Sequence, residues 1–171
     1  MKVFITAVSG VGKSTVVNEL VNRGYTAYDA DDSGINLTRL EIKASGEHVE
    51  WPKGFVDWTY YAWNANETRL QELLAENDTV FIAGILGNQR KLYHYFDRLI
   101  ALVLDDPKER ERRLTMRPKR EFGDDDKNNQ RRLERYSQHM AQFAASGLIM
   151  VDNSGSIKDT VDQIEQVTGL R

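Results

Sequence analysis

The first fifteen positions of this 171-residue chain limit its possible folds more than any other stretch. Residues 2–6 form a short apolar run rich in β-branched side chains, as in a buried strand. The segment Ala7-Val-Ser-Gly-Val-Gly-Lys-Ser-Thr15 follows at once, and a helical pattern of apolar residues starts at Val16. A strand, a glycine-bearing loop that ends in Gly-Lys-Ser, and a helix together form the context of a phosphate-binding loop.

The residue types in this loop suit a triphosphate. Gly10 and Gly12 allow successive backbone N–H groups to face inward, and the helix start near Lys13 adds its unpaired N–H groups and the positive end of its dipole. Lys13 would reach the β- and γ-phosphates, and the Ser14 hydroxyl would bind Mg²⁺. We therefore predict that the loop binds a triphosphate with Mg²⁺, and the loop residues expected to hold them are Ser9, Gly10, Val11, Gly12, Lys13, Ser14 and Thr15. Ala7 stands where this motif usually has its first glycine, at the end of the strand, where a small residue suffices.

Bulk composition excludes several other classes of protein. The formal net charge of −3 gives no general electrostatic case for nucleic-acid binding, so no nucleic acid is expected as a partner. There are no cysteines, which excludes disulfides and thiolate metal sites, and no apolar run approaches membrane-spanning length. The N-terminus reads as a strand and not as a signal peptide. We expect a single domain over residues 1–171, a cytoplasmic protein with no membrane partner, and a monomer or homodimer.

Two acidic residues close the predicted second strand. Residues 25–28 deliver Asp29-Ala30-Asp31 at the carboxyl end of that strand, where open parallel sheets bind their ligands. A carboxylate there can hold Mg²⁺, directly or through water, or accept the proton of a substrate hydroxyl. The alternative is a solvated turn or a helix cap, in which aspartate is common.

Residues 33–57 are irregular, apart from a weak helical pattern from Ile35 to Ile42, and a long stretch of this kind is often functional. We predict a flap over about 33–57 that receives the phosphate acceptor. A helix is predicted over residues 57–77, with Asp57 as its cap. The aromatic residues in and near this region would either stack on an acceptor or pack in the core, and they are Trp51, Trp58, Tyr60, Tyr61 and Trp63.

The predicted third strand, over residues 79–84, ends without the acidic residue that many nucleotide-binding proteins place there to direct Mg²⁺. That carboxylate must come from elsewhere, and Asp29 and Asp31 are the nearest candidates. Asn88 and Arg90 follow at the ligand edge and could contact substrate. Asn88 could instead cap a helix.

Arginines gather in the helix that opens at Pro107 and just beyond it. Strands are predicted over 99–104 and 148–152, and helices from 107, over 128–146 and from 156 onward. Arg113 and Arg117 lie one turn apart and would point the same way. A solvated charged helix is the common meaning of such a run. Between two helices of this domain, the run instead suggests a lid over about 117–127 that closes on phosphates, which arginine binds bidentately.

This order of elements, over nearly the whole chain, resembles the nucleoside-monophosphate-kinase-like branch of small P-loop kinases, which includes adenylate, shikimate and gluconate kinases. It also looks like uncharacterised bacterial ATP-binding kinases of that group. The match is carried by residues 7–15, by Asp29-Ala30-Asp31 and by Arg113-Leu-Thr-Met-Arg117. The resemblance implies an α/β fold of three layers, with a central parallel sheet of five strands and an Arg-rich lid.

The same resemblance implies ATP, with Mg²⁺, as the cofactor and assigns roles to residues. Asp29 would sit near Mg²⁺ and Asp31 near the acceptor hydroxyl, as in the acidic pair of shikimate kinases. Arg113 and Arg117 look like the paired arginines of adenylate kinases that contact ATP, and residues 152–157 lie where those kinases enclose adenine. Arg39 could hold a phosphate of a monophosphate acceptor.

The expected activity is transfer of the γ-phosphoryl group of ATP to a small-molecule acceptor, with Lys13, Asp31, Arg113 and Arg117 as catalytic residues. A nucleoside or nucleotide acceptor is favoured by the aromatic residues, and a polyol or sugar acid, as in shikimate and gluconate kinases, is the alternative. A nucleotide-binding switch with little phosphotransfer is the alternative of another class, against which the arginines argue. No Asn-Lys-x-Asp guanine motif is present, so a GTPase is not expected.

Overall fold

A parallel sheet of five strands forms the centre of the computed structural model, which describes residues 1–50, 56–116, 130–131 and 133–171. The strand order is β2-β6-β1-β7-β8, and all four pairings are parallel. The strands are β1 (Lys2–Thr6), β2 (Ala27–Asp29), β6 (Val80–Ala83), β7 (Arg98–Val103) and β8 (Ile149–Asp152). The predicted five-stranded parallel sheet is confirmed, with β1 and its glycine loop in the middle.

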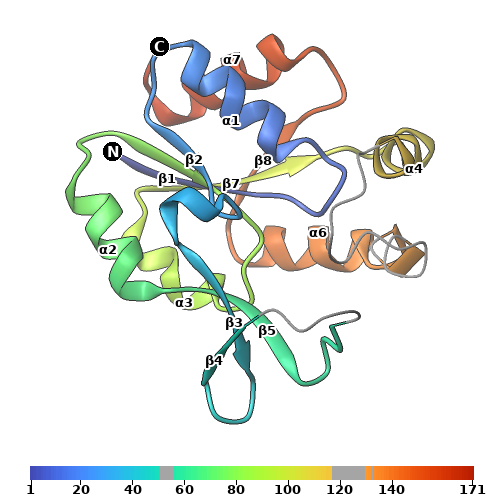
Figure 1. Ribbon diagram of the computed structural model, residues 1–171. Helices are drawn as coiled ribbons and strands as arrows, with labels where there is room; N and C mark the ends of the chain where they lie inside the picture. The colour runs from blue at the N-terminus through green and yellow to red at the C-terminus, as the bar shows by residue number, and fades with distance from the viewer. Residues whose placement is uncertain (51–55, 117–129, 132) are drawn as a thin grey trace.

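Helices cover both faces of this sheet, which gives the three layers that were predicted (Figure 1). One face carries α1 (Lys13–Asn22) and α7 (Ile157–Thr168). The other carries α2 (Glu67–Ala75), α3 (Gln89–Leu92) and α6 (Tyr136–Ala145), while α4 (Pro107–Thr115) lies beyond the end of the sheet. Two short 3₁₀ turns are also present, Ser33–Ile35 and Tyr93–Tyr95, and residues 130–131 and 133–134 are helical as well.

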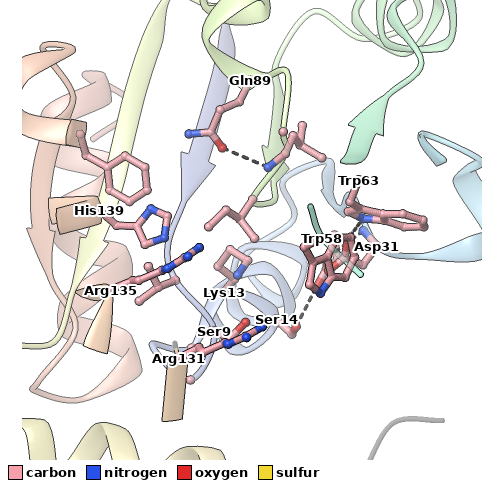
Figure 2. A pocket seen from close by; sticks show the side chains of 18 of the residues that line it. Ser9, Lys13, Ser14, Asp31, Trp58, Trp63, Gln89, Arg131, Arg135 and His139 are labelled. Atoms are coloured by element: carbon pink, nitrogen blue, oxygen red, sulfur yellow. Dashed lines mark hydrogen bonds between the residues drawn. The ribbon is translucent and has the colours of Figure 1, made fainter. Parts of the chain in front are cut away.

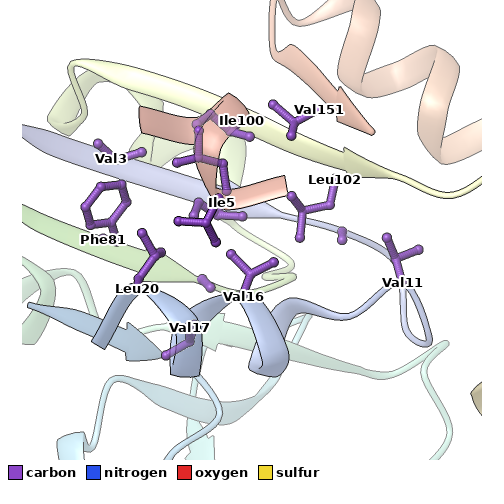
Figure 3. Close-up of a cluster of buried hydrophobic side chains, with 14 of the residues drawn as sticks. Val3, Ile5, Val11, Val16, Val17, Leu20, Phe81, Ile100, Leu102 and Val151 are labelled. Carbon is purple, nitrogen blue, oxygen red and sulfur yellow. The ribbon is translucent and has the colours of Figure 1, made fainter. Parts of the chain in front are cut away.

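The core follows the two-residue period of the strands, because successive side chains point to opposite faces of a sheet. Val3 and Ile5 of β1 pack on the α1–α7 side, while Phe4 between them joins the cluster on the α2 side. Figure 3 shows the first cluster, in which Val16 and Leu20 of α1 meet the sheet. Strands buried on both faces explain the continuous apolar runs in the sequence.

The glycine loop requires its glycines for two reasons. Gly10 has φ +87° and Gly12 has φ +115°, a region of backbone conformation that other residues rarely adopt. A Cβ atom on Gly12 would also lie 2.6 Å from the Asn153 side-chain nitrogen, and one on Gly10 would lie 2.8 Å from a Leu114 carbon. The loop is therefore packed tightly between α4 and the end of β8.

A second, antiparallel sheet of three strands was not predicted. Its order is β4-β3-β5, and it is made of β3 (Thr38–Ile42), β4 (His48–Val49) and β5 (Tyr61–Ala65). The helix predicted over 57–77 is wrong in its first part, because α2 starts only at Glu67, where the Asn66 side chain accepts a hydrogen bond from the Arg69 N–H (3.4 Å). The helical pattern from Ile35 to Ile42 is also wrong. We call this element the small sheet.

The loop after β6 fastens the small sheet to the main sheet. The Gly87 N–H donates to the Trp63 carbonyl (2.7 Å), and the Asn88 side chain bonds both the N–H and the C=O of Ala65 (2.9 Å each). Asn88 occupies the N-cap position of α3, as one of the two alternatives predicted, but its side chain makes no capping bond. A Cβ on Gly87 would lie 2.6 Å from the Asn64 oxygen, and only a glycine allows this approach.

The later helices begin as the sequence predicted. Asp106 accepts from the N–H groups of Lys108 and Glu109, with Pro107 in the first turn of α4, and Ser156 caps α7 through the Asp159 N–H. The helix predicted over 128–146 has a turn at Arg135 within its described part, and α6 follows from Tyr136. Among the described residues, no helix is both long and apolar enough to cross a membrane.

Candidate functional site

A cleft of about 1750 Å³ lies at the carboxyl ends of the central strands, between the glycine loop, the small sheet and the helical segment around α6 (Figure 2). Among the residues that the structure describes, seven cationic side chains line it: Lys13, Lys43, Arg90, Arg112, Arg113, Arg131 and Arg135. The carboxylates of this described part that line it are Asp29, Asp31 and Asp57. Although the chain as a whole is acidic, this cleft is therefore suited to an anionic ligand.

The glycine loop forms the floor of the cleft. Six of its seven predicted ligand-binding residues line the cleft: Ser9, Gly10, Gly12, Lys13, Ser14 and Thr15. Val11 is fully buried, and its carbonyl accepts hydrogen bonds from the side chains of Arg113 (3.1 Å) and Asn153. The Lys13 ammonium folds back over the loop to donate to the Ala7 carbonyl (2.8 Å). These bonds hold the loop in the curled form that a phosphate needs.

Ser14 and Asp29 meet beside the loop. The Ser14 hydroxyl donates to Asp29 Oδ2 (2.6 Å), although the two residues lie fifteen positions apart in the sequence. Asp29 Oδ1 accepts from the backbone N–H of Asp31 (3.1 Å), which orients the carboxylate. A hydroxyl and a carboxylate oxygen are hard ligands of the kind that Mg²⁺ takes from a protein, along with water and phosphate oxygens. The two residues predicted to hold Mg²⁺ therefore fit that ion.

The second acidic residue, Asp31, faces the small sheet. Its Oδ1 accepts a hydrogen bond from the indole N–H of Trp63 on β5 (2.8 Å). Figure 2 shows Trp58 next to this pair, on the same side of the cleft. Both tryptophans line the cleft, so at least part of the aromatic cluster in the sequence belongs to the site.

A row of basic residues forms the opposite side of the cleft. Arg131, Arg135 and His139 follow one another at intervals of four residues, which places them on one helical face, and all three line the cleft. Figure 2 shows them across the cleft from Asp31 and the tryptophans. This row was not predicted from the sequence, although basic residues at i, i+4 and i+8 beside an apolar face indicated it.

Other predicted site residues fall in different places. Arg90 lines the cleft, and so does Arg113, whose guanidinium also bonds Glu109 (2.8 Å). Arg39 does not line the cleft, and its guanidinium pairs with Glu41. Asn88 does not line it either, because its side chain joins the two sheets. Arg117 and the lid predicted over about 117–127 lie outside the described residues.

Arg110, which the sequence placed in the same cationic cluster, is structural. It is buried, stacks over the Tyr136 ring with 3.7 Å between guanidinium carbon and ring centre, and donates to the Leu104 carbonyl. The Tyr136 hydroxyl accepts from the Leu104 N–H (2.8 Å). This contact joins α4 to α6 behind the cleft, and it is a cation–π interaction in a desolvated place.

His139 gives the structure a pH-dependent stability. Partial burial, with a smaller contribution from the Arg135 charge, lowers the pKa of His139 below its usual value of 6.5. The neutral imidazole is therefore favoured in the folded state, and the stability that it contributes is fully present above pH 6.5 and is lost as the pH falls through the folded-state pKa. We expect the His139→Gln variant to lose less free energy of unfolding than the wild type between pH 7.5 and pH 5.5.

Urea unfolding of both proteins at the two pH values measures this difference. Glutamine is polar and similar in size, so it can still pack against Phe143, whose ring is 6.0 Å from the imidazole, centre to centre. The wild type and the variant must have equal urea m-values for the comparison to hold. Equal losses of stability in the two proteins would contradict the assignment.

Comparisons with known proteins support the fold. No family model matches the sequence, and no curated protein sequence matches it significantly. The structure is similar to the crystal structure of shikimate kinase from Bacteroides thetaiotaomicron, with a TM-score of 0.60 over 99% of this chain and 98% of that chain, at 14% identity. At this identity the likeness shows the fold, which is the α/β fold with a central parallel sheet of five strands that the sequence resemblance implied.

Proposed function

We propose that this protein transfers the γ-phosphoryl group of ATP, bound with Mg²⁺, to a small acceptor that carries a hydroxyl or a phosphate. One observation carries the proposal. The phosphate-binding Lys13, the Ser14–Asp29 pair and Asp31 all line one cleft, so that donor, metal and acceptor positions would adjoin. A module that only binds nucleotides needs no carboxylate for an acceptor, and Asp31 would supply one.

The donor would lie on the glycine loop. Its phosphates would accept hydrogen bonds from the loop N–H groups, and the Lys13 ammonium would move from the Ala7 carbonyl to the β- and γ-phosphates. Ser14 and Asp29 would hold Mg²⁺, which neutralises charge on the phosphates when bound. The adenine would lie near Asn153, Gly155 and Ile157, which line the same cleft.

Asp31 would act on the acceptor. A carboxylate within hydrogen-bond reach of the acceptor hydroxyl can orient it and accept its proton as the new P–O bond forms. The bond between the γ-phosphorus and the bridging oxygen of ATP breaks, and ADP leaves with the electron pair. For a phosphate acceptor, which is already ionised, only the orienting part of this role applies.

Arginines would stabilise the charge on the transferring group. Arg113, Arg131 and Arg135 line the cleft around the loop, and guanidinium groups bind phosphate oxygens through two parallel bonds. Arg117 remains a prediction from the sequence. In the sequence, the predicted lid lies between the arginines of α4 and the row of basic residues around α6.

The cleft also narrows the class of acceptor. Trp58, Tyr61 and Trp63 line the cleft, and the cationic Lys43 and Arg90 line it too. Aromatic rings favour a flat or ring-shaped group, and cations favour an acidic one. A nucleoside or nucleotide acceptor meets these conditions best, and a sugar acid or acidic polyol is the second candidate.

A coupled ADP-release assay tests the proposal. The protein, with ATP and Mg²⁺, is assayed against nucleosides, nucleoside monophosphates, sugar acids and shikimate. We expect one class to raise ADP release well above the rate without acceptor, with a phosphorylated product that mass spectrometry identifies. Tight ATP binding with no response to any acceptor would argue against phosphotransfer and favour the nucleotide-binding switch.

A further inference from the structure

We propose that Trp63 is a positioning residue, which holds the Asp31 carboxylate toward the acceptor and away from the metal position. This inference rests on the proposed function, because it gives Asp31 the role of acting on the acceptor. It goes further in assigning a task to the small sheet, which carries Trp63 and which the sequence did not predict. It also predicts a specific coupling between two residues 32 positions apart.

The contact is short, and it joins the loop after β2 to strand β5 of the small sheet. The Trp63 indole N–H lies 2.8 Å from Asp31 Oδ1, a distance typical of a hydrogen bond to a charged acceptor. Asp31 is exposed, and it lies in a loop two residues beyond Asp29, the last residue of β2. An exposed aspartate in a loop ordinarily samples several rotamers, so a partner on a regular strand restricts where its charge lies.

Trp63 is held firmly enough to serve as that partner. Its carbonyl accepts from the Gly87 N–H (2.7 Å), and it pairs with Leu40 in the antiparallel register of the small sheet. Two residues on, Ala65 is bonded at both its N–H and its C=O by the Asn88 side chain. The loop after β6 thus holds the strand that carries the indole, and the indole holds the Asp31 carboxylate.

The position of Asp29 explains why such a device is useful. Asp29 and Asp31 lie two residues apart, and either carboxylate could bind Mg²⁺. Asp29 is bonded to Ser14, on the metal side, while the bond from Trp63 draws Asp31 to the side of the small sheet. Two identical side chains therefore receive separate tasks from their different partners.

An indole suits this task because it is a neutral donor. It can only donate, so it binds the carboxylate and cannot compete for a substrate proton. A guanidinium or ammonium in its place would add a positive charge, which weakens a carboxylate as a proton acceptor. The carboxylate has a capacity of about four hydrogen bonds. The bond from the indole uses one of these and orients the group.

A double-mutant cycle on turnover tests the coupling. The wild type, Trp63→Phe, Asp31→Ala and the double variant are assayed for ADP release with the acceptor that the panel identifies, or with water as acceptor if the panel identifies none. We expect Trp63→Phe to lower kcat about tenfold, the order of a hydrogen bond to a charged group, with KM for ATP unchanged. Adding Trp63→Phe to Asp31→Ala should have no further effect.

The second readout needs no turnover. Trp63→Phe removes one indole N–H signal from the ¹H–¹⁵N spectrum and so assigns it to Trp63. In Asp31→Ala that signal should move and exchange faster with water, while in Asp32→Ala, one residue along the same loop, it should stay. An unmoved signal in Asp31→Ala would overturn the proposal at once.

The two readouts separate the possible failures. A signal that moves, together with additive effects on kcat, would mean that Trp63 supports the fold of the wall and does not act through Asp31. A wild type that transfers no phosphoryl group to any acceptor or to water would overturn the proposed function, and the role of Trp63 with it. The NMR signal distinguishes that case from an incorrect contact, because it reports the hydrogen bond alone.

Discussion

Replacing Lys13 by alanine should lower the rate of ATP-dependent phosphoryl transfer roughly 10³-fold and leave the fold intact. Preorganised donors aimed at developing charge are each worth about 10²- to 10³-fold, and Lys13 adds a full charge to that geometry. The ammonium already lies within the loop, bonded to the Ala7 carbonyl (2.8 Å). Only a short movement would bring it onto a γ-phosphate.

The matched control is Lys158→Ala, which removes an exposed lysine of α7 that does not line the cleft. Lys13→Arg keeps the charge but replaces a compact ammonium with a planar fork, so it should not restore the rate. Steady-state ADP release and thermal unfolding are measured on all three variants. A Lys13→Ala protein that turns over as fast as the Lys158→Ala protein would rule out the loop as the phosphate site.

The sequence predicted the central sheet because its strands are coded locally. The inner strands β1 and β6 are apolar runs too short for a helix and almost fully buried, and turn or cap residues bound them. The caps of α4 and α7 were equally legible, since Asp106-Pro107 and Ser156 each satisfy the N–H groups of the next turn. The carboxyl ends of parallel strands lie at the same edge of the sheet, so the sequence alone predicted that Ser14 and Asp29 lie close together.

The small sheet was missed because its pattern is ambiguous. Leu40 and Ile42 are apolar and alternate with Arg39 and Glu41, a two-residue period that indicates a strand. Ile35 and Leu37 before them favoured the helical reading. For β5, the leucines from Leu70 onward led us to start the predicted helix too early, so that it included an aromatic stretch that favours a strand. Asn66, the actual cap, was the available signal for the correct start of α2.

The site was predicted where local sequence decides it, and missed where the small sheet decides it. The glycine loop follows β1, Asp29 ends β2 and Asp31 lies just beyond it, so their place at the edge of the main sheet could be predicted. The bond between Trp63 and Asp31 depends on how the small sheet packs against the loop after β6, and no local pattern encodes that packing. The pairing of Arg39 with Glu41 could not be predicted for the same reason, because it depends on strand β3 of the small sheet.

The division of labour between the two aspartates leads to the second large effect. Asp29→Asn should lower turnover at least about 10- to 100-fold at low Mg²⁺, and added Mg²⁺ should recover part of the loss, because even a residue that only bonds a metal ligand is typically worth that much. Asparagine keeps the shape of the side chain and can still accept from the Asp31 N–H, so the loop should keep its form. What is lost is the negative charge beside the Ser14 hydroxyl, 2.6 Å away.

Asp32→Asn is the matched control for this change. Asp32 lies in the same loop, does not line the cleft, and accepts from the Gly34 N–H (2.8 Å), a bond that asparagine can also accept. Rates are measured for both variants over a series of Mg²⁺ concentrations at saturating ATP. If the ion lies between Ser14 and Asp29, only Asp29→Asn should shift the Mg²⁺ dependence, and Ser14→Ala should shift it in the same direction. An unchanged Mg²⁺ dependence in Asp29→Asn would mean that Asp29 does not hold the ion. Asp31 would then be the next candidate, although its bond to Trp63 draws its carboxylate toward the small sheet.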